Sequence, residues 1–185
     1  EGGEQPQIII VNALGQTQRR IPVATQAEDP KTQISFARAA APGRILVTLP
    51  ADRRIREYNL EGNILWEWIA PQRPAYAVRL PNGHILASLR GDRLVEITRA
   101  GKIVWQLTPK DFTKPYLNAL SMVQVLSNGN LVLATATPDA KVSRLMEFTR
   151  DKKLIWSARQ SDRQSPRHFH ILTTNGKPCP GPLLR

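Results

Sequence analysis

The sequence predicts an all-β protein, a β-propeller of four-stranded antiparallel blades, on the basis of three observations. A phrase ending in tryptophan recurs as G-N-I-L-W, G-K-I-V-W and K-K-L-I-W at residues 62–66, 101–105 and 152–156. Each copy follows a strand-like run that carries a glutamate, and each is preceded by a turn glycine with an apolar run. Self-similarity at a period of roughly forty to fifty residues indicates an array of supersecondary units, and here each unit consists of strands.

The most regular copy lies at residues 76–108. Strands are expected at residues 76–80, 84–89, 93–98 and 102–107. The turn Pro81-Asn82-Gly83 supplies the positive φ angles that a tight hairpin requires, and β-branched and aromatic residues fill the runs. No stretch shows the 3.6-residue apolar period of a substantial helix. Four antiparallel strands in about forty residues make one propeller blade.

The whole chain, residues 1–185, is expected to form one domain with three complete blades. Their expected bounds are residues 33–70, 75–109 and 119–160, with half-blades at 7–23 and 168–185. The first half-blade matches the third and fourth strands of a blade, and the second matches the first strand, at 168–172, and a truncated second strand. Joining them in one composite blade would close a four-bladed ring without an exposed sheet edge. The alternative is a homodimer in which each half-blade pairs with another copy, giving an eight-bladed ring.

The repeated side chains have expected structural roles. The repeated tryptophans, Trp66, Trp105 and Trp156, are expected to fill the gaps between adjacent blades. The repeated glutamates, Glu57, Glu96 and Glu147, recur at one place in successive blades and should therefore lie far apart around the ring. We expect them to pair with the basic side chains beside them in the sequence, namely Arg56, Arg93 and Arg144.

Composition points to a basic protein with acidic partners. The formal net charge is +11 and is dispersed over turns and strand rims. Such a field favours a protein partner in a complex, an anionic polysaccharide or a lipid surface, whereas nucleic acid is not expected because no recognised nucleic-acid module accompanies the charge. No run of eighteen apolar residues could span a membrane. The first residue, Glu1, fits a mature exported protein, periplasmic or secreted. The single cysteine, Cys179, can form no internal disulfide.

One pair of phrases resembles a known group of propellers. The run L-P-N-G-H-I-L-A and the later run D-R-L-V-E-I-T-R-A-G-K-I-V-W resemble the repeats of the quinoprotein-like (PQQ-like) β-propellers, closest to the arylsulfotransferase-like branch. The resemblance covers about residues 7–177. It implies a propeller of an exported type, in families that include both enzymes and assembly scaffolds, so it specifies a blade and not an activity.

The resemblance also nominates positions for an axial site. In the arylsulfotransferase-like enzymes a histidine eight positions before the turn glycine can face the axis, and the matching residues here are Ser35, Ala75, Ser121 and His168. Sulfuryl transfer needs a nucleophile and several cations, which this set does not supply. If the chain is a hydrolase or transferase of anionic substrates, His168 and His170 are the candidate catalytic residues. Ser35 and Ser121 are candidate binding residues at an axial mouth that takes carbohydrate or another small ligand.

No cofactor and no metal site is expected. A quinone enzyme would need a larger ring with carboxylate and calcium ligands, and the His168–His170 pair has metal-binding spacing but no evident third ligand. A lengthened connection between blades carries Lys110, Phe112, Lys114 and Tyr116. This aromatic and basic loop either contacts a partner or covers a blade edge. The favoured function is therefore a non-catalytic exported propeller that acts as a binding or scaffold subunit of a larger assembly.

Overall fold

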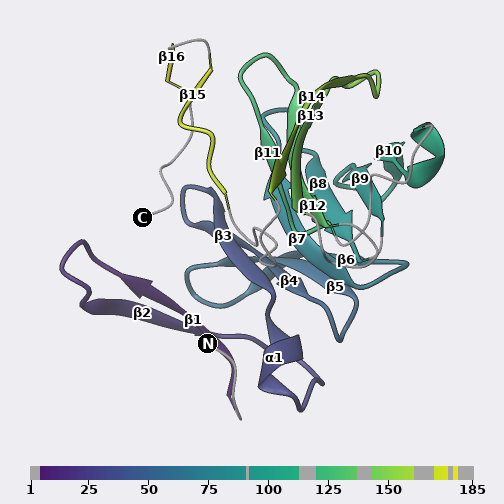
Figure 1. The fold of residues 1–185 in the computed structure, drawn as a ribbon. Helices are drawn as coiled ribbons and strands as arrows, with labels where there is room; N and C mark the ends of the chain where they lie inside the picture. The colour runs from purple at the N-terminus through teal and green to yellow at the C-terminus, as the bar shows by residue number, and fades with distance from the viewer. Residues whose placement is uncertain are drawn as a thin grey trace. The chain divides into compact units, whose positions relative to one another are not determined.

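The computed structural model describes residues 5–90, 92–112, 120–136, 143–160, 169–174 and 177–178. Within this described part the protein is almost entirely β-structure, as predicted (Figure 1). No helix in it is long and apolar enough to cross a membrane.

Three four-stranded antiparallel sheets form the body of the structure, and each has its strands in chain order. The first blade consists of β3 (Phe36–Ala41), β4 (Arg44–Leu49), β5 (Arg54–Asn59) and β6 (Ile64–Ile69). The second blade consists of β7 (Pro74–Arg79), β8 (Ile85–Leu89), β9 (Arg93–Ile97) and β10 (Ile103–Leu107). The third blade consists of β11 (Met122–Val125), β12 (Leu131–Ala136), β13 (Ser143–Phe148) and β14 (Leu154–Gln160).

Two short hairpins flank these sheets in the sequence. Strands β1 (Gln7–Val11) and β2 (Thr17–Pro22) pair with each other and are called the N-terminal hairpin below. Near the other terminus, β15 (Thr173–Thr174) pairs with β16 (Lys177–Pro178). The predicted strand at 168–172 differs from the structure, because residues 169–172 form no strand and pairing begins at Thr173. The backbone N–H of Ile171 donates instead to the Gln124 side chain, at 2.7 Å.

The turn residues explain why the hairpins repeat. Gly62 and Gly101 close the turns between the third and fourth strands with φ angles of 90° and 81°, a region that favours glycine. The third blade has Lys152 at this position, with φ 68°, and its ammonium group binds Asp111 at 2.8 Å. Asp111 belongs to the 3₁₀-helix η1 (Pro109–Asp111). The sequence departs from the glycine of the repeat here, but the left-handed turn is kept.

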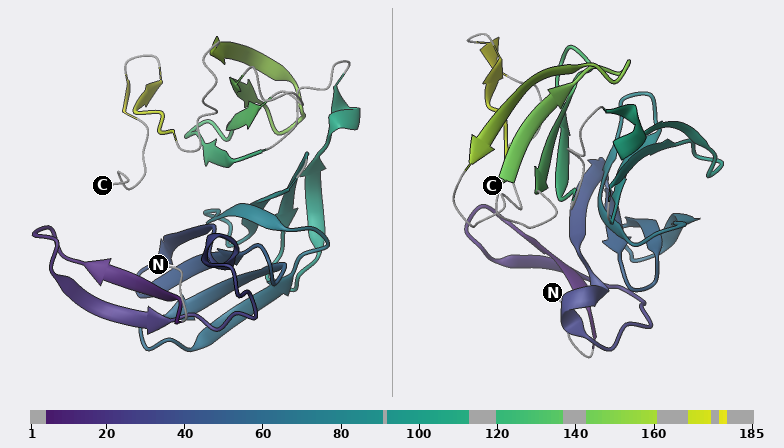
Figure 2. Two further views of the ribbon diagram at one scale, coloured as in Figure 1. Left: turned by 60° about the horizontal axis from the view of Figure 1, so that its bottom comes forward. Right: turned by 45° about the vertical axis from the view of Figure 1, so that its right-hand side comes forward.

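The chain forms two compact units, and each is described by itself. The first comprises residues 1–90 and 95–106, and the second comprises 91–94 and 107–185. In the first unit the N-terminal hairpin, the first blade and the second blade lie one beside the next, with helix α1 (Pro30–Gln33) between β2 and β3 in the chain (Figures 1 and 2). In the second unit the third blade has an apolar core, where Leu133, Met146 and Phe148 are fully buried.

Two apolar clusters hold the first unit together. One lies between the N-terminal hairpin and the first blade and includes Ile21, Ile45 and Val47. The other lies between the first and second blades and includes Leu46 and Trp68. Alternate residues of β4 therefore serve opposite faces of the same sheet. This is why β4 is apolar on both sides.

Indole groups join the first blade to the second. Trp66 Nε1 donates to the carbonyl of Arg99 at 2.7 Å, and Trp68 Nε1 donates to that of Gly101 at 3.1 Å. The predicted packing role of Trp66 is thus confirmed, although Trp68 is the more buried ring. Trp156 differs: it is 37% exposed and donates to Glu147 of its own sheet.

Candidate binding site

Each repeated glutamate is buried against the residue that follows a turn glycine. Glu57 accepts from Arg44 at 2.9 Å, Glu96 is bound by His84 at 2.6 Å, and Glu147 accepts from Asn130 at 2.6 Å. Each of these partners directly follows the turn glycine: Arg44 begins β4, and His84 and Asn130 immediately precede β8 and β12. In each blade, the residue directly after the turn glycine therefore binds the glutamate of the third strand.

The predicted pairing of these glutamates with adjacent arginines is wrong for Glu57. Arg56 is the neighbour of Glu57 in the sequence, but successive residues of a strand point to opposite faces. Arg56 binds Glu67 at 2.6 Å on the other face of the sheet. Arg44 reaches Glu57 because Leu46, two residues further along β4, lies directly opposite Glu57 in the register, so the two side chains share a face.

Glu57 differs from the other two glutamates in being surrounded by three arginines. Arg79, from the end of β7, forms an ion pair with it. Arg99, from the turn between β9 and β10, reaches it at 3.2 Å, and Arg44 completes the group at 2.9 Å. We call Glu57, Arg44, Arg79 and Arg99 the arginine cluster. It brings together three strands and one turn from the first and second blades.

The arginine cluster is not neutral. The Glu57 side chain is fully buried, whereas the side chains of Arg44 and Arg99 are 46% and 43% exposed. One carboxylate thus faces three guanidinium groups, which leaves two positive charges without a carboxylate inside the cluster. Burial lowers the pKa of Arg79, and the charges of Arg99 and Arg44 lower it further. Burial, followed by the charge of Arg44, lowers the pKa of Arg99.

Burial is the larger cause of both pKa shifts, and repulsion among the three cations adds to it. The cations remain charged at neutral pH because arginine does not deprotonate in proteins. Arg79 Nε is buried without a hydrogen-bond partner in the described structure. An anion placed beside Arg44 and Arg99 would relieve this repulsion. Guanidinium groups bind carboxylates through two parallel hydrogen bonds, so an acidic side chain is a fitting ligand.

Arg99 is held in position from the first blade. Its guanidinium lies 5.7 Å from the centre of the Trp66 ring and donates to the Leu65 carbonyl at 3.3 Å. A cation over an indole face is attracted by the ring quadrupole. Arg99 is therefore preorganised and keeps one face of its guanidinium on the indole.

The hydroxyl groups of the two candidate serines both donate hydrogen bonds to backbone carbonyl groups. Ser35 Oγ donates to the carbonyl of Ala75 at 3.0 Å and lies 2.7 Å from Thr48 Oγ1. Ser121 Oγ donates to the carbonyl of Ala134 at 3.4 Å within the third blade. Ser35 thus links the first strand of its blade to the matching position of the next blade.

The long connecting loop is described only in part. Lys110 is exposed, whereas the Phe112 ring packs against the buried Phe148 ring with centroids 4.8 Å apart. This contact of Phe112 agrees with the second of the two alternatives for the loop, in which its aromatic side chains cover a blade edge. Lys114 and Tyr116 lie outside the described residues.

The histidine site and the metal expectation remain predictions. His170 is half-buried, and His168 lies outside the described residues, as does Cys179. No group of three or more histidine, cysteine, aspartate or glutamate side chains within the described ranges could hold a metal ion.

The arginine cluster can be seen in the sequence only when neighbouring repeats are compared with each other. When the repeats are aligned on their turn glycines, Arg79 lies four positions before Gly83 and Arg99 lies two positions before Gly101. Both belong to the second blade, while Glu57 and Arg44 belong to the first. Only the packing of consecutive blades brings these four positions together.

No protein-family model matches the sequence, and no curated protein matches it. Solved structures do match. A protein of unknown function from Bacteroides caccae is 23% identical, with a TM-score of 0.75, over 86% of this chain and 61% of that one. Virginiamycin B lyase from Staphylococcus aureus is 20% identical, with a TM-score of 0.57, over 80% of this chain and 47% of that one. BBS1N in complex with ARL6DN is 18% identical, with a TM-score of 0.51, over 82% and 46%.

The chain spans less than two thirds of the length of each of these proteins. They include an enzyme and a protein solved with a partner, so the likeness does not select between catalysis and binding. The resemblance to the quinoprotein-like repeats, and to their arylsulfotransferase-like branch, stays a prediction, as does the number of blades. At identities below 25% the likeness concerns the fold alone, and that fold is a β-propeller.

Proposed function

We propose that this chain is a non-catalytic binding propeller, a subunit of a larger assembly that holds an acidic protein partner at the arginine cluster. One observation carries the proposal: three arginines converge on one buried carboxylate, and two of them keep nearly half of their side-chain surface in solvent. The export of the protein belongs to the same proposal and rests on the sequence alone.

An acidic side chain of the partner would bind between Arg44 and Arg99. It would complete the charge balance that Glu57 begins, since each added carboxylate neutralises one of the two surplus positive charges. The wider field supports the encounter, because a net charge of +11 steers acidic proteins toward the surface. Binding should therefore weaken as the salt concentration rises.

Exposed aliphatic side chains give a second kind of contact surface. The last strands of the first two blades expose Ile64 and Leu65 on β6 and Ile103 and Val104 on β10. Apolar residues on exposed edge strands are typical of surfaces that meet another chain. Among the similar structures, BBS1N was solved in complex with ARL6DN, which supports a binding role for propellers of this kind.

Binding of poly-L-glutamate, followed by fluorescence anisotropy at low and at moderate salt, tests the proposal. We expect Arg99→Gln and Arg44→Gln each to weaken binding about tenfold, because each removes a charged hydrogen-bond donor from the site. Arg73→Gln is the matched control, since it removes one exposed arginine from the connection between β6 and β7. The control should bind within about twofold of the unaltered protein.

Two outcomes would count against the proposal. If Arg73→Gln weakens binding as much as Arg99→Gln, the chain attracts anions through its overall charge and the arginine cluster is no site. If heparin or anionic lipid vesicles bind in a cluster-dependent way and poly-L-glutamate does not, the partner is a polysaccharide or a membrane.

A further inference from the structure

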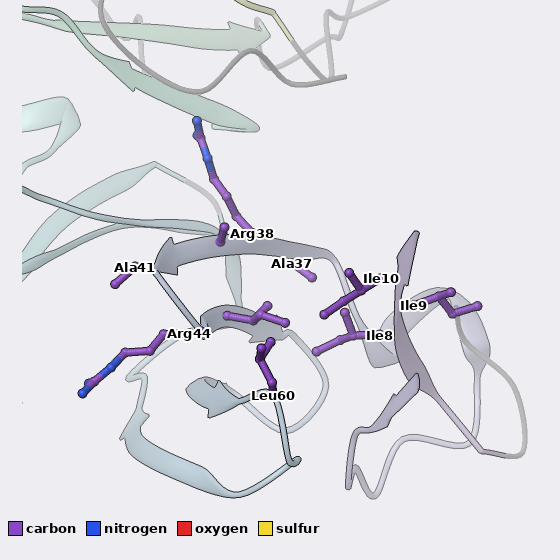
Figure 3. A pocket seen from close by; sticks show the side chains of 11 residues that line it. Ile8, Ile9, Ile10, Ala37, Arg38, Ala41, Arg44 and Leu60 are labelled. Carbon is purple, nitrogen blue, oxygen red and sulfur yellow. The ribbon is translucent and has the colours of Figure 1, made fainter. Parts of the chain in front are cut away.

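A pocket of about 300 Å³ lies between the N-terminal hairpin and the first blade. Figure 3 shows Ile8 and Ile10 pointing from β1 toward Ala37 and Leu60, while Ile9 points the other way. Ile45 of β4 also lines the pocket. Its walls are therefore mostly aliphatic, and its size lies at the small end of ligand pockets.

The repeat shows which side chain this pocket lacks. Counting from the turn glycines, Ile8, Ala37 and Ile45 match Ile55, Ala77 and Ile85 at the interface of the first and second blades. Those three belong to one buried cluster, and Leu46 of β4 is packed in the same cluster. Leu46 comes from the strand that pairs with β5, the match of β1. The pocket therefore lies where a side chain equivalent to Leu46 would pack if a further strand paired with β1.

The edge of β1 is prepared for such a strand. Strands β5, β9 and β13 have a neighbour on both sides, whereas β1 pairs with β2 alone among the described strands. Val23 N–H donates to the Pro6 carbonyl at 2.8 Å, and hydrogen-bonded pairs alternate along an antiparallel ladder. Ile8 and Ile10 therefore bond toward β2. Ile9 presents its N–H and C=O to the opposite edge.

We propose that β1 binds an extended segment of a partner protein, with an aliphatic residue in the pocket and acidic residues beside it. The aliphatic residue would lie opposite Ile10, as Leu46 lies opposite Glu57. Strand addition of this kind takes affinity from main-chain hydrogen bonds and specificity from alternate side chains.

Charge selects the acidic residues of the segment. Arg19 and Arg20 are exposed on β2, directly beside β1. Arg38 and Arg44 border the pocket, but their guanidinium groups donate to Tyr76 and Glu57 on the side of the second blade. The proposal rests on the proposed function, since it describes a second part of the same acidic partner. The two sites share only Arg44, whereas the free edge of β1, the aliphatic pocket, Arg19 and Arg20 lie outside the arginine cluster, so the two proposals can fail separately.

An acetylated hexapeptide of alternating leucine and glutamate, labelled with a fluorophore, is the probe. We expect it to bind the full chain and to bind Ile9→Pro at least tenfold more weakly, because proline removes the N–H at the free edge without touching the ladder to β2. Ile9→Ala, which keeps the N–H, is the matched control and should bind within about twofold of the unaltered protein. Ala37→Leu fills the pocket and should also weaken binding at least tenfold.

The outcomes separate this proposal from the proposed function. Arg99→Gln should leave peptide binding within about twofold, although it weakens binding of poly-L-glutamate. A peptide in which serine replaces leucine should bind at least tenfold more weakly if the pocket takes the leucine side chain.

The proposal fails if the unaltered chain does not bind the peptide, or if Ile9→Pro and Ala37→Leu bind it as Ile9→Ala does. It also fails if the chain is a dimer that Ile9→Pro converts to a monomer, since the occupant would then be a second copy. Circular dichroism shows whether each variant is folded. If Ile9→Pro is unfolded, the binding of Ala37→Leu decides the test.

Discussion

Two successive interfaces of the first unit place the same register positions together and fill them with different side chains. Where the first blade meets the second, Glu57, Arg79 and Arg99 form an ion cluster. Where the N-terminal hairpin meets the first blade, the matching positions are Ile10, Ala39 and Leu60, counted from the turn glycines. These three line the apolar pocket.

The difference follows from what each interface contains. We call the contact of the N-terminal hairpin with the first blade the first interface, and the contact of the first blade with the second blade the second interface. Ala77 is fully buried in the second interface, while the matching Ala37 is exposed in the first. The hairpin supplies only the third and fourth strands of a blade, so the side chains that would cover Ala37 are missing from it. The repeated backbone sets where side chains meet, and the residues at those positions decide whether the meeting place is charged, apolar or open.

Removing the carboxylate should have the largest effect on the second interface. Glu57→Gln leaves three guanidinium groups without their shared counter-charge, and breaking a buried charge group from one side costs about 3–5 kcal/mol of unfolding free energy. Urea unfolding at pH 7 measures the loss. Glu61→Gln is the control, because that side chain is 63% exposed and its nearest arginine is 4.0 Å away. A Glu57→Gln variant as stable as Glu61→Gln would show that the cluster is held together by other contacts.

Opening the second interface should make it resemble the first. Leu46 is 2% exposed, so Leu46→Ala leaves a cavity between the first and second blades. We expect a loss of about 3 kcal/mol in unfolding free energy. Leu14→Ala, at a position 83% exposed, should change stability by less than about 0.5 kcal/mol. Equal effects of the two variants would contradict the assignment of Leu46 as the side chain whose counterpart the pocket lacks.

The sequence predicted the backbone better than it predicted the contacts. The second blade was expected from strand-like runs and an Asn-Gly turn, and its strands lie within one or two residues of the expected bounds. Those signals are local, since turn chemistry and alternation act within a hairpin. Two of the three partners of Glu57, namely Arg79 and Arg99, come from another blade, and no single repeat contains that information. The third, Arg44, comes from the neighbouring strand and not from the adjacent sequence position.

The same reasoning explains what became of the candidate site residues. Ser35 was selected by its distance from a turn glycine, and that distance did identify a position where consecutive blades touch. It could not show that the hydroxyl would be used for a hydrogen bond to Ala75. The pocket at Ile10 has no motif at all, since it arises from strands that the hairpin lacks.

The smallest expected effect concerns a contact that the second interface has and the first cannot form. The rings of Phe36 and Tyr76 lie 4.3 Å apart, and Arg38 donates to the Tyr76 hydroxyl at 2.7 Å. Tyr76 is at the same distance from its glycine as Phe36, and the hairpin has no first strand to bring a matching ring to Phe36. Tyr76→Phe keeps the ring and should cost about 1 kcal/mol, the net value of one hydrogen bond.

Alkaline pH gives Tyr76→Phe a second readout. Burial raises the pKa of Tyr76 above its ordinary value, and Arg38 opposes this rise without cancelling it. Because the folded pKa is the higher one, the unfolded chain loses this proton first, near pH 10. Stability is therefore fully present below about pH 10 and falls as the pH rises through the folded pKa. Urea unfolding at pH 8 and at pH 11 should show this fall in the unaltered protein and a smaller fall in Tyr76→Phe; equal falls would show that other groups carry the alkaline loss.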